Sequence, residues 1–260
     1  MTRPMLPRRR QSIYLLPNLF TTACLFSGFF AIVMAMNNQF AQAAVAIFVA
    51  MVLDSLDGRV ARLTNTTSDF GANYDSLADM VSFGVAPALV AYVYALQGMG
   101  KLGWLAAFIY VAGAALRLAR FNTNIGVVDK RFFQGLPSPA AAALVAGLIW
   151  LVTDLHEARF ITYSAADLRW LVWGVTLYAG VTMVSMVPFY SFKDINLRRS
   201  VPFVFVALGA LVLVLVSQDP PSMLFLAVAA YALSGYVLFF WRRAKGRGGD
   251  LFVESDSKDL

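Results

Sequence analysis

Long apolar runs separated by short polar breaks are the dominant pattern along this chain. A helix needs roughly 20 apolar residues to cross the hydrocarbon core of a bilayer, and by that measure we count about eight spanning helices. They are expected near residues 13–36, 40–63, 74–97, 102–122, 136–153, 168–190, 201–217 and 221–241. The pattern therefore predicts an all-α integral membrane protein.

The composition supports the membrane assignment and limits the domain organisation. Hydrophobic residues make up 59% and charged residues 14% of the 260 positions, whereas soluble domains average about 45–50% and 25%. A chain of this length cannot bury so much apolar surface in a core of its own, so lipid must cover it. We expect one membrane-embedded domain over 1–243, followed by a disordered cytoplasmic tail over 244–260 that is polar, Gly-rich and then acidic.

Lysine and arginine residues gather in short clusters between the apolar runs, as at Arg8-Arg9-Arg10. Such clusters are typical of helix ends that face anionic lipid, and none extends into a separate soluble domain that would indicate nucleic acid. All but three of the 21 lysines and arginines fall on the side of the membrane that holds both termini; the exceptions are Lys101, Arg159 and Arg169. The positive-inside rule then predicts that both termini and the polar segment 54–79 face the cytoplasm.

Cys24 and His156 are the only cysteine and the only histidine of the chain. Their scarcity excludes a disulfide framework, a metal site built on cysteine or histidine, and a catalytic triad that uses histidine. Any bound metal must therefore be held by oxygen ligands, and any general base is expected to be a carboxylate.

Two pairs of aspartates lie in the segment 54–79, DSLDGRVARLTNTTSDFGANYDSLAD, where one apolar run ends and the next begins. Asp54 and Asp57 are three residues apart and Asp75 and Asp79 four apart, so each pair shares one helix face. Carboxylates at membrane depth repel one another unless a cation neutralises them. An all-oxygen set favours Mg²⁺ or Mn²⁺, and four carboxylates suffice for a two-metal site. The alternative, a solvated loop with helix caps, explains one or two aspartates but not two pairs on facing helices.

The residues beside the aspartates suit a diphosphate. Gly58 removes a side chain where phosphate would approach the helix backbone. Arg62 supplies a planar fork of donors for phosphate oxygens, and Gly71 lets the following helix begin close by. Two metal ions beside a diphosphate suit displacement at phosphorus, so the membrane domain is expected to be catalytic.

The order Asp54-x-x-Asp57-Gly58-x-x-Ala61-Arg62, followed by Gly71-x-x-x-Asp75-x-x-x-Asp79, resembles the signature of the CDP-alcohol phosphotransferase family at every defining position. The resemblance implies the fold of that family, and that the first three of these aspartates bind two metal ions. It implies that the fourth, Asp79, also lies near a metal and acts as the base that activates the acceptor hydroxyl. Gly58 and Arg62 would contact the CDP diphosphate by the same resemblance, which also implies a homodimer.

Two further positions extend this resemblance toward the nucleotide. Pro17-Asn18-x-x-Thr21 is similar to the pattern with which family members touch the cytidine, so the resemblance implies that Asn18 and Thr21 bind it. The alternative is a helix that simply begins at a proline. Ser68 lies where family members place a hydroxyl near the nucleotide, and Gly71 is expected to contact the same substrate.

The segments Arg117-Leu-Ala-Arg120-Phe-Asn122 and Phe133-Gln-Gly135-Leu-Pro137-Ser138-Pro139-Ala140 resemble the bacterial phosphatidylserine synthases of the family. That resemblance implies CDP-diacylglycerol and L-serine as substrates, and a bacterial inner membrane with the site facing the cytoplasm. Serine carries a carboxylate, which Arg117 and Arg120 are suited to hold at the cytoplasmic end of the fourth helix, with Asn122 beside them. The alternative is that these arginines only anchor the helix end.

Two other functions stay open at this point. Another acceptor, namely glycerol 3-phosphate, inositol phosphate or choline, would use the same signature, although a phosphorylated acceptor calls for more basic residues around it. A cation transporter also carries aspartates on membrane helices, but usually near the midplane on broken helices. The predicted aspartates lie at the cytoplasmic boundary beside Gly58 and Arg62, which favours phosphotransfer.

Overall fold

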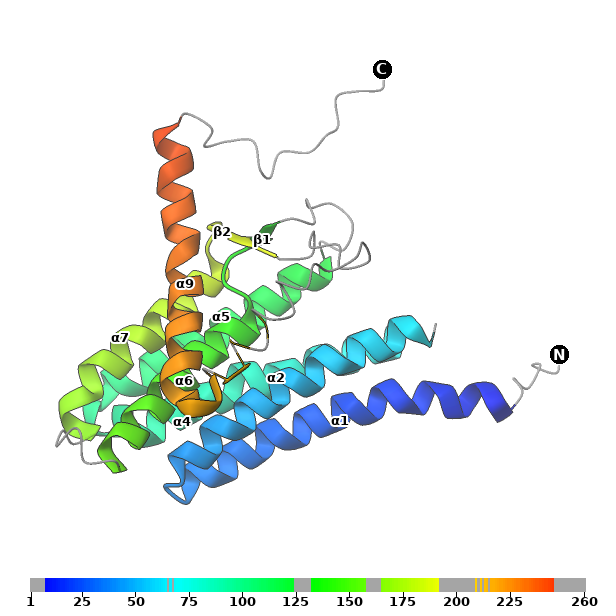
Figure 1. The fold of residues 1–260 in the computed structure, drawn as a ribbon, viewed down its shortest axis with the longest axis horizontal. Helices are drawn as coiled ribbons and strands as arrows, with labels where there is room; N and C mark the ends of the chain where they lie inside the picture. The colour runs from blue at the N-terminus through cyan, green and yellow to red at the C-terminus, as the bar shows by residue number, and fades with distance from the viewer. Residues whose placement is uncertain are drawn as a thin grey trace.

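The computed structural model describes residues 8–64, 66, 68–123, 132–157, 165–191, 209, 211, 213–214 and 216–245. Helices dominate this part of the chain (Figure 1), which confirms the helical expectation. The elements in chain order are α1 (Arg8–Met36), α2 (Phe40–Leu63), α3 (Asp69–Asp79), the π-helical η1 (Met80–Val85), α4 (Ala86–Ala91), the π-helical η2 (Tyr92–Leu96), the 3₁₀ turn η3 (Gln97–Met99), α5 (Lys101–Thr123), β1 (Phe132–Gln134), α6 (Ser138–Glu157), α7 (Ala165–Val184), β2 (Pro188–Tyr190) and α9 (Pro220–Ala244).

Six helical stretches among the described residues are long and apolar enough to cross a membrane. They are Pro17–Met36, Phe40–Leu63, Asp69–Met99, Lys101–Thr123, Ser138–His156 and Pro220–Trp241. The chain is therefore a multi-pass membrane protein. Most of the expected span at 201–217 and almost all of the expected tail at 244–260 lie outside the described residues, so the count of eight and the disordered tail stay predictions.

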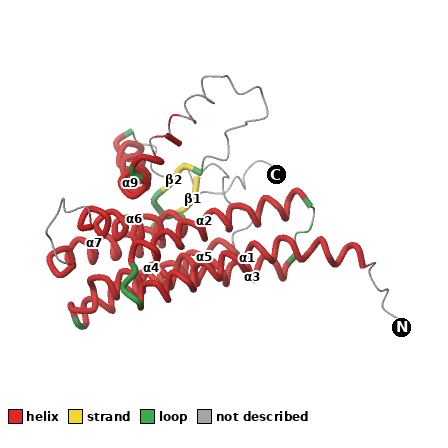
Figure 2. Tube along the Cα trace, turned by 60° about the horizontal axis from the view of Figure 1, so that its bottom comes forward, coloured by secondary structure: helices red, strands yellow, loops and turns green. Residues whose placement is uncertain are grey.

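One expected span was wrong at its C-terminal end. The pattern placed a helix at 168–190, but α7 ends at Val184 and residues 188–190 form β2. Pro188 explains the difference, because the residue before a proline is disfavoured in the helical conformation. β2 pairs antiparallel with β1, in the register Phe132↔Tyr190, Phe133↔Phe189 and Gln134↔Pro188. The ribbon lies against α9 at one side of the helices (Figure 2).

The first two helices form an antiparallel hairpin and lie side by side along their length (Figure 1). The two helices are joined by a tight turn at residues 37–39, in which Asn38 has a φ of 59°. Asparagine tolerates this left-handed conformation better than most residues. The hairpin brings the start of α1 beside the end of α2. The next helix along the chain, α3, also packs against α1.

Small residues allow the remaining helices to approach closely, as is common in membrane bundles. Alanines such as Ala43, Ala44 and Ala142 are fully buried. One such close contact joins α5 to α7, where a Cβ added to Gly180 would lie 2.8 Å from the Cα of Tyr110. Neither helix leaves room for a larger side chain at this crossing.

A π-helical turn, η1, follows directly after Asp79. The amide of Ala86 donates to the Val81 carbonyl five residues back, and Pro87 has no amide to offer the Phe83 carbonyl. Tyr110 of α5, which is fully buried, donates its hydroxyl to that carbonyl at 3.0 Å. This bond ties α5 to the turn that follows the last aspartate of the cluster.

Candidate active site

Three of the four predicted aspartates converge at one point. Asp54 and Asp57 come from the last turns of α2 and Asp75 from α3, and one carboxylate oxygen of each lies within 4.8 Å of the others. Asp57 is only 5% exposed. The other two are half-buried. Carboxylates this close together and partly withdrawn from water are unfavourable unless a cation lies between them, and a set made only of carboxylate oxygens is suited to a hard divalent ion. The donor set therefore fits the expected metal.

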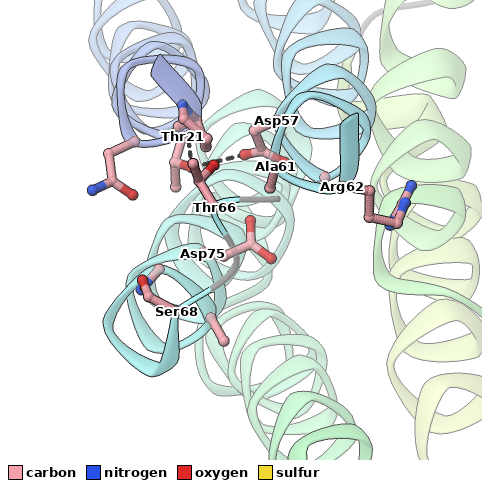
Figure 3. A pocket seen from close by; sticks show the side chains of 12 residues that line it. Thr21, Asp57, Ala61, Arg62, Thr66, Ser68 and Asp75 are labelled. Atoms are coloured by element: carbon pink, nitrogen blue, oxygen red, sulfur yellow. Dashed lines mark hydrogen bonds between the residues drawn. The ribbon is translucent and has the colours of Figure 1, made fainter. Parts of the chain in front are cut away.

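A hydroxyl from α1 fixes the orientation of the most buried aspartate. Thr21 is 4% exposed. Its Oγ1 donates to Oδ2 of Asp57 at 2.9 Å, and the Pro17 carbonyl oxygen lies 3.2 Å from the same hydroxyl oxygen. Figure 3 shows Thr21, Asp57 and Asp75 around one space between α1, α2 and α3.

Asp79 lies apart from the three converging carboxylates. It is the last residue of α3, and its side chain interacts with that of Asp54. Its Oδ1 is buried and has no hydrogen-bond partner within the described part of the chain. A buried carboxylate oxygen without a donor is free to accept a proton from a substrate, which suits the expected base.

All six residues expected to contact the CDP moiety line one cavity of about 270 Å³. The cavity also reaches Asp57 and Asp75, so it is continuous with the carboxylate cluster. Its full lining is Pro17, Asn18, Thr21, Asp57, Gly58, Ala61, Arg62, Thr66, Ser68, Gly71, Ala72 and Asp75. The structure therefore brings the six residues together, and their role in binding CDP stays a prediction.

The two glycines of the signature lie where side chains crowd the cavity wall. A Cβ at Gly58 would be 3.6 Å from Nη1 of Arg62, so the guanidinium lies over this glycine. A Cβ at Gly71 would be 3.2 Å from Oγ of Ser68 and 3.7 Å from Oδ1 of Asn18. Ser68 caps α3, accepting from the Gly71 amide at 3.1 Å, which leaves its own hydroxyl proton available to a ligand.

Four further residues line the cavity. Pro17 and Ala61 belong to the sequence motifs but were given no role, and Thr66 and Ala72 were missed by sequence reasoning. Thr66 is the polar one. It is 8% exposed, and its Oγ1 lies 2.6 Å from Oγ1 of Thr64. No signal in the sequence separates Thr66 from the other threonines of the turn, because its burial depends on how α3 folds back on α1.

The three residues expected to bind the acceptor all lie in the last two turns of α5. Nη1 of Arg117 donates to Oγ of Ser138 at 2.7 Å. Nε of Arg117 and Nη1 of Arg120 are buried and have no hydrogen-bond partner among the described residues. Asn122 is exposed and donates to Oγ of Ser76, the residue after Asp75, at 3.0 Å. The arginines thus hold unused donors, whereas Asn122 connects α5 to α3.

The arginines and the aspartates belong to one site. The charge of Arg117 interacts with that of Asp79, and Ser76 joins α3 to α5 through Asn122. The arrangement therefore places a group of acidic oxygens beside a group of basic donors, with Asp79 nearest the donors. Such a site can hold two anionic substrates, one through a metal and one directly.

A family model described as CDP-alcohol phosphatidyltransferase matches residues 14–182, a range that contains the four aspartates and the arginines of α5. The chain belongs to the CDP-alcohol phosphatidyltransferase family. This confirms the resemblance seen in the aspartate signature. The family uses divalent cations, and the three converging carboxylates of this member form a group that can hold one.

Several relatives carry the name CDP-diacylglycerol–serine O-phosphatidyltransferase. The protein from Helicobacter pylori is 41% identical over 184 residues, which cover 71% of this chain and 75% of the relative. The protein from Mycobacterium leprae is 31% identical over 229 residues, covering 86% and 74%. That of Methanocaldococcus jannaschii is 45% identical over 108 residues, covering 42% and 50%.

Proposed function

We propose that this protein transfers the phosphatidyl group of CDP-diacylglycerol to the hydroxyl of L-serine, forming phosphatidylserine and releasing CMP. The observation that carries the proposal is the convergence of three carboxylates beside a cavity whose walls suit a nucleoside diphosphate. The names of its relatives point to the same pair of substrates.

The carboxylate cluster is proposed to hold two divalent cations, Mg²⁺ or Mn²⁺. Asp54, Asp57 and Asp75 would be the main ligands, and Asp79 would lie close enough to contact one ion. When bound, such ions neutralise the diphosphate and stabilise the leaving CMP. The hydrogen bond from Thr21 would keep Asp57 in its ligating orientation, because it fixes one of the two carboxylate oxygens.

The cavity walls are proposed to bind the CDP moiety. Arg62 would donate to the diphosphate, which Gly58 allows to approach the end of α2. Asn18 and Thr21, at the start of the membrane-spanning part of α1, would contact the cytidine. The free hydroxyl proton of Ser68 and the close approach at Gly71 add a polar wall on the opposite side.

Asp79 is proposed to be the general base. Its buried, unpaired oxygen would take the proton of the serine hydroxyl as the hydroxyl oxygen bonds to the β-phosphorus. The bond from that phosphorus to the bridging oxygen breaks at the same centre, and the bridging oxygen leaves with CMP. Serine is a weak nucleophile, so holding it beside the diphosphate should supply much of the rate.

The arginines of α5 are proposed to bind the carboxylate of serine. Nε of Arg117 and Nη1 of Arg120 are buried donors in need of an acceptor, and a carboxylate supplies two oxygens. Asn122 would then assist at the edge of the site while it bonds to Ser76. An acceptor without a carboxylate, such as choline, would leave both buried donors unpaired.

The site is proposed to face the cytoplasm of a bacterial inner membrane, with both chain termini on that side and eight spanning helices. The lysines and arginines support this orientation, because all but three of the 21 would fall on the side of the termini. Tryptophan gathers at both membrane interfaces and marks where a helix leaves the membrane. Trp104, Trp170 and Trp173 lie at the ends of α5 and α7 far from the site, and Nε1 of Trp173 donates to the Leu102 carbonyl. The homodimer is proposed on the family resemblance alone.

An acceptor panel tests this function. The purified protein would receive CDP-diacylglycerol, Mg²⁺ or Mn²⁺, and one labelled acceptor at a time: L-serine, glycerol 3-phosphate, inositol phosphate or choline. We expect labelled lipid and stoichiometric CMP only with serine. If another acceptor gave lipid product at a higher kcat/KM than serine, that acceptor would replace serine as the proposed substrate, and the proposed phosphotransfer chemistry would stand.

A further inference from the structure

Ser138 accepts a hydrogen bond from a charged group at the arginine end of the site. It is the first residue of α6 and is 1% exposed. Its Oγ accepts a hydrogen bond of 2.7 Å from Nη1 of Arg117. A half-buried guanidinium is therefore held by a neutral hydroxyl, which fixes its direction without cancelling its charge.

The bond to Ser138 determines which edge of the guanidinium remains available. In the planar guanidinium, Nε and Nη2 donate along one edge. Nη1 lies on the other side of the Nε–Cζ bond and is not part of that edge. Since Ser138 takes Nη1, the edge formed by Nε and Nη2 turns away from α6. That edge matches the two oxygens of a carboxylate, and its Nε is buried without a hydrogen-bond partner in the described chain.

The backbone before Ser138 is fixed by the end of α7. Gly135 has φ 75°, and a Cβ there would lie 3.0 Å from the Ser185 carbonyl oxygen, so only glycine fits. Its amide donates to the Val187 carbonyl at 2.9 Å, and the amide of Leu136 donates to the Thr182 carbonyl at 3.1 Å. The start of α6 is thus held in place independently of any ligand.

We propose that Ser138 is a positioning residue, which turns the Nε–Nη2 edge of Arg117 toward the carboxylate of the acceptor and so selects an amino acid over an uncharged alcohol. The inference rests on the proposed function, in which Arg117 binds serine. Ser138 itself touches no substrate. The cavity for CDP is lined by α1, α2, α3 and the residues between α2 and α3, so Ser138 affects the acceptor and not the lipid nucleotide.

Two substitutions separate the hydrogen bond from simple packing. Ser138→Ala removes the acceptor atom, and Ser138→Cys keeps a side chain of similar shape but offers only a weak acceptor. Loss of a hydrogen bond to a charged group predicts a rise of about tenfold in the KM for serine in both variants. The KM for CDP-diacylglycerol and the kcat should each stay within about twofold of the wild-type values.

The matched control is Ser185→Ala. Ser185 lies in the same group of connections, and its hydroxyl donates to the Thr182 carbonyl at 2.8 Å without touching Arg117. This variant should keep the wild-type KM for serine. A second comparison places Ser138→Ala in an Arg117→Ala background, where it should raise the KM for serine no further, because the two residues act as one unit.

The kinetics are measured on the full-length protein in detergent with CDP-diacylglycerol, Mg²⁺ and a range of serine concentrations, alongside its thermal unfolding. Wild-type protein that makes no phosphatidylserine would refute the proposed function. If the wild-type protein makes phosphatidylserine and the Cys variant has the same KM for serine as the wild type, the proposed function stands and the role of Ser138 is overturned. An equal rise in both KM values, or a further rise in the Arg117→Ala background, would overturn it as well.

Discussion

The site has two halves of opposite character. On α2 and α3, three carboxylates lie within 4.8 Å of one another, and a threonine donates to one of them. On α5, Arg117 and Arg120 each carry a buried nitrogen with no hydrogen-bond partner among the described residues. A different nitrogen of Arg117 donates to a serine. The acidic half is incomplete without a cation, and the basic half is incomplete without an anion. We therefore propose that the two substrates are recognised by different means, one through metal and one directly.

The strongest test of the acidic half is Asp57→Asn. Asparagine keeps the shape but loses the charge that the cations require, so kcat/KM should fall by at least about a thousandfold, or roughly 4 kcal/mol. Initial rates of CMP release measure the effect. Asp69→Asn is the control, because Asp69 is exposed in the first turn of α3 outside the cavity, and it should change the rate little. Retention of a tenth of the activity in Asp57→Asn would contradict the metal assignment.

Asp79 lies where the two halves meet, and its proposed role as general base can be distinguished from metal binding by experiment. Asp79→Asn should lower kcat by about a hundredfold to a thousandfold and leave the KM for CDP-diacylglycerol almost unchanged, since a general base acts on the proton in the transition state. Added Mg²⁺ or Mn²⁺ should not restore it, whereas Asp75→Asn should recover part of its activity. Equal recovery of both variants would make Asp79 another metal ligand.

The basic half is tested by Arg117→Ala. Removing this donor should raise the KM for serine by roughly ten- to a hundredfold, because hydrogen bonds to charged groups are worth about 1.5–3 kcal/mol. Serine saturation curves at fixed CDP-diacylglycerol measure the change. Arg243→Ala serves as the control, since Arg243 is an exposed arginine near the end of α9. If the KM for CDP-diacylglycerol rose instead, Arg117 would belong to the nucleotide half.

The smallest expected effect concerns the link between the halves. Tyr110→Phe removes the hydroxyl that satisfies the Phe83 carbonyl within η1, so a buried carbonyl loses its donor. Stability should fall by about 1–3 kcal/mol, visible as a lower unfolding temperature in detergent. Tyr178→Phe is the control on the neighbouring helix α7, where the lost bond is to the Ala232 carbonyl of α9. A larger loss of kcat in Tyr110→Phe than in Tyr178→Phe would show that the link also orients Asp79.

The acidic half could be predicted from the sequence because its residues follow one another along two helices. Helical spacing alone puts Asp54 and Asp57 on one face, and the signature added Gly58 and Arg62. The basic half could be predicted only in part. Ser138 is 21 residues from Arg117, and their contact depends on the β1–β2 ribbon, which no periodicity indicated.

The fold divides in the same way. Apolar length identified the six described stretches that are long and apolar enough to cross a membrane, since bilayer thickness sets that length directly. It could not identify η1, which arises because Pro87 has no amide and Tyr110 supplies the missing donor from another helix. Nor could it show the early end of α7 at Val184, where the preference of the residue before Pro188 outweighs the apolar pattern. A contact between distant segments therefore decided the first feature, and a local effect of proline decided the second.

The most direct test of the account is the dependence of phosphatidylserine formation on a divalent cation. Purified protein would be given CDP-diacylglycerol and labelled serine, first in excess chelator and then after Mg²⁺ or Mn²⁺ is added beyond the chelator. The convergence of Asp54, Asp57 and Asp75 predicts no labelled lipid in chelator and full recovery with at least one of the two ions. Undiminished synthesis in excess chelator would contradict the account, because the acidic half would then have to bind a diphosphate without the cation that makes such binding favourable.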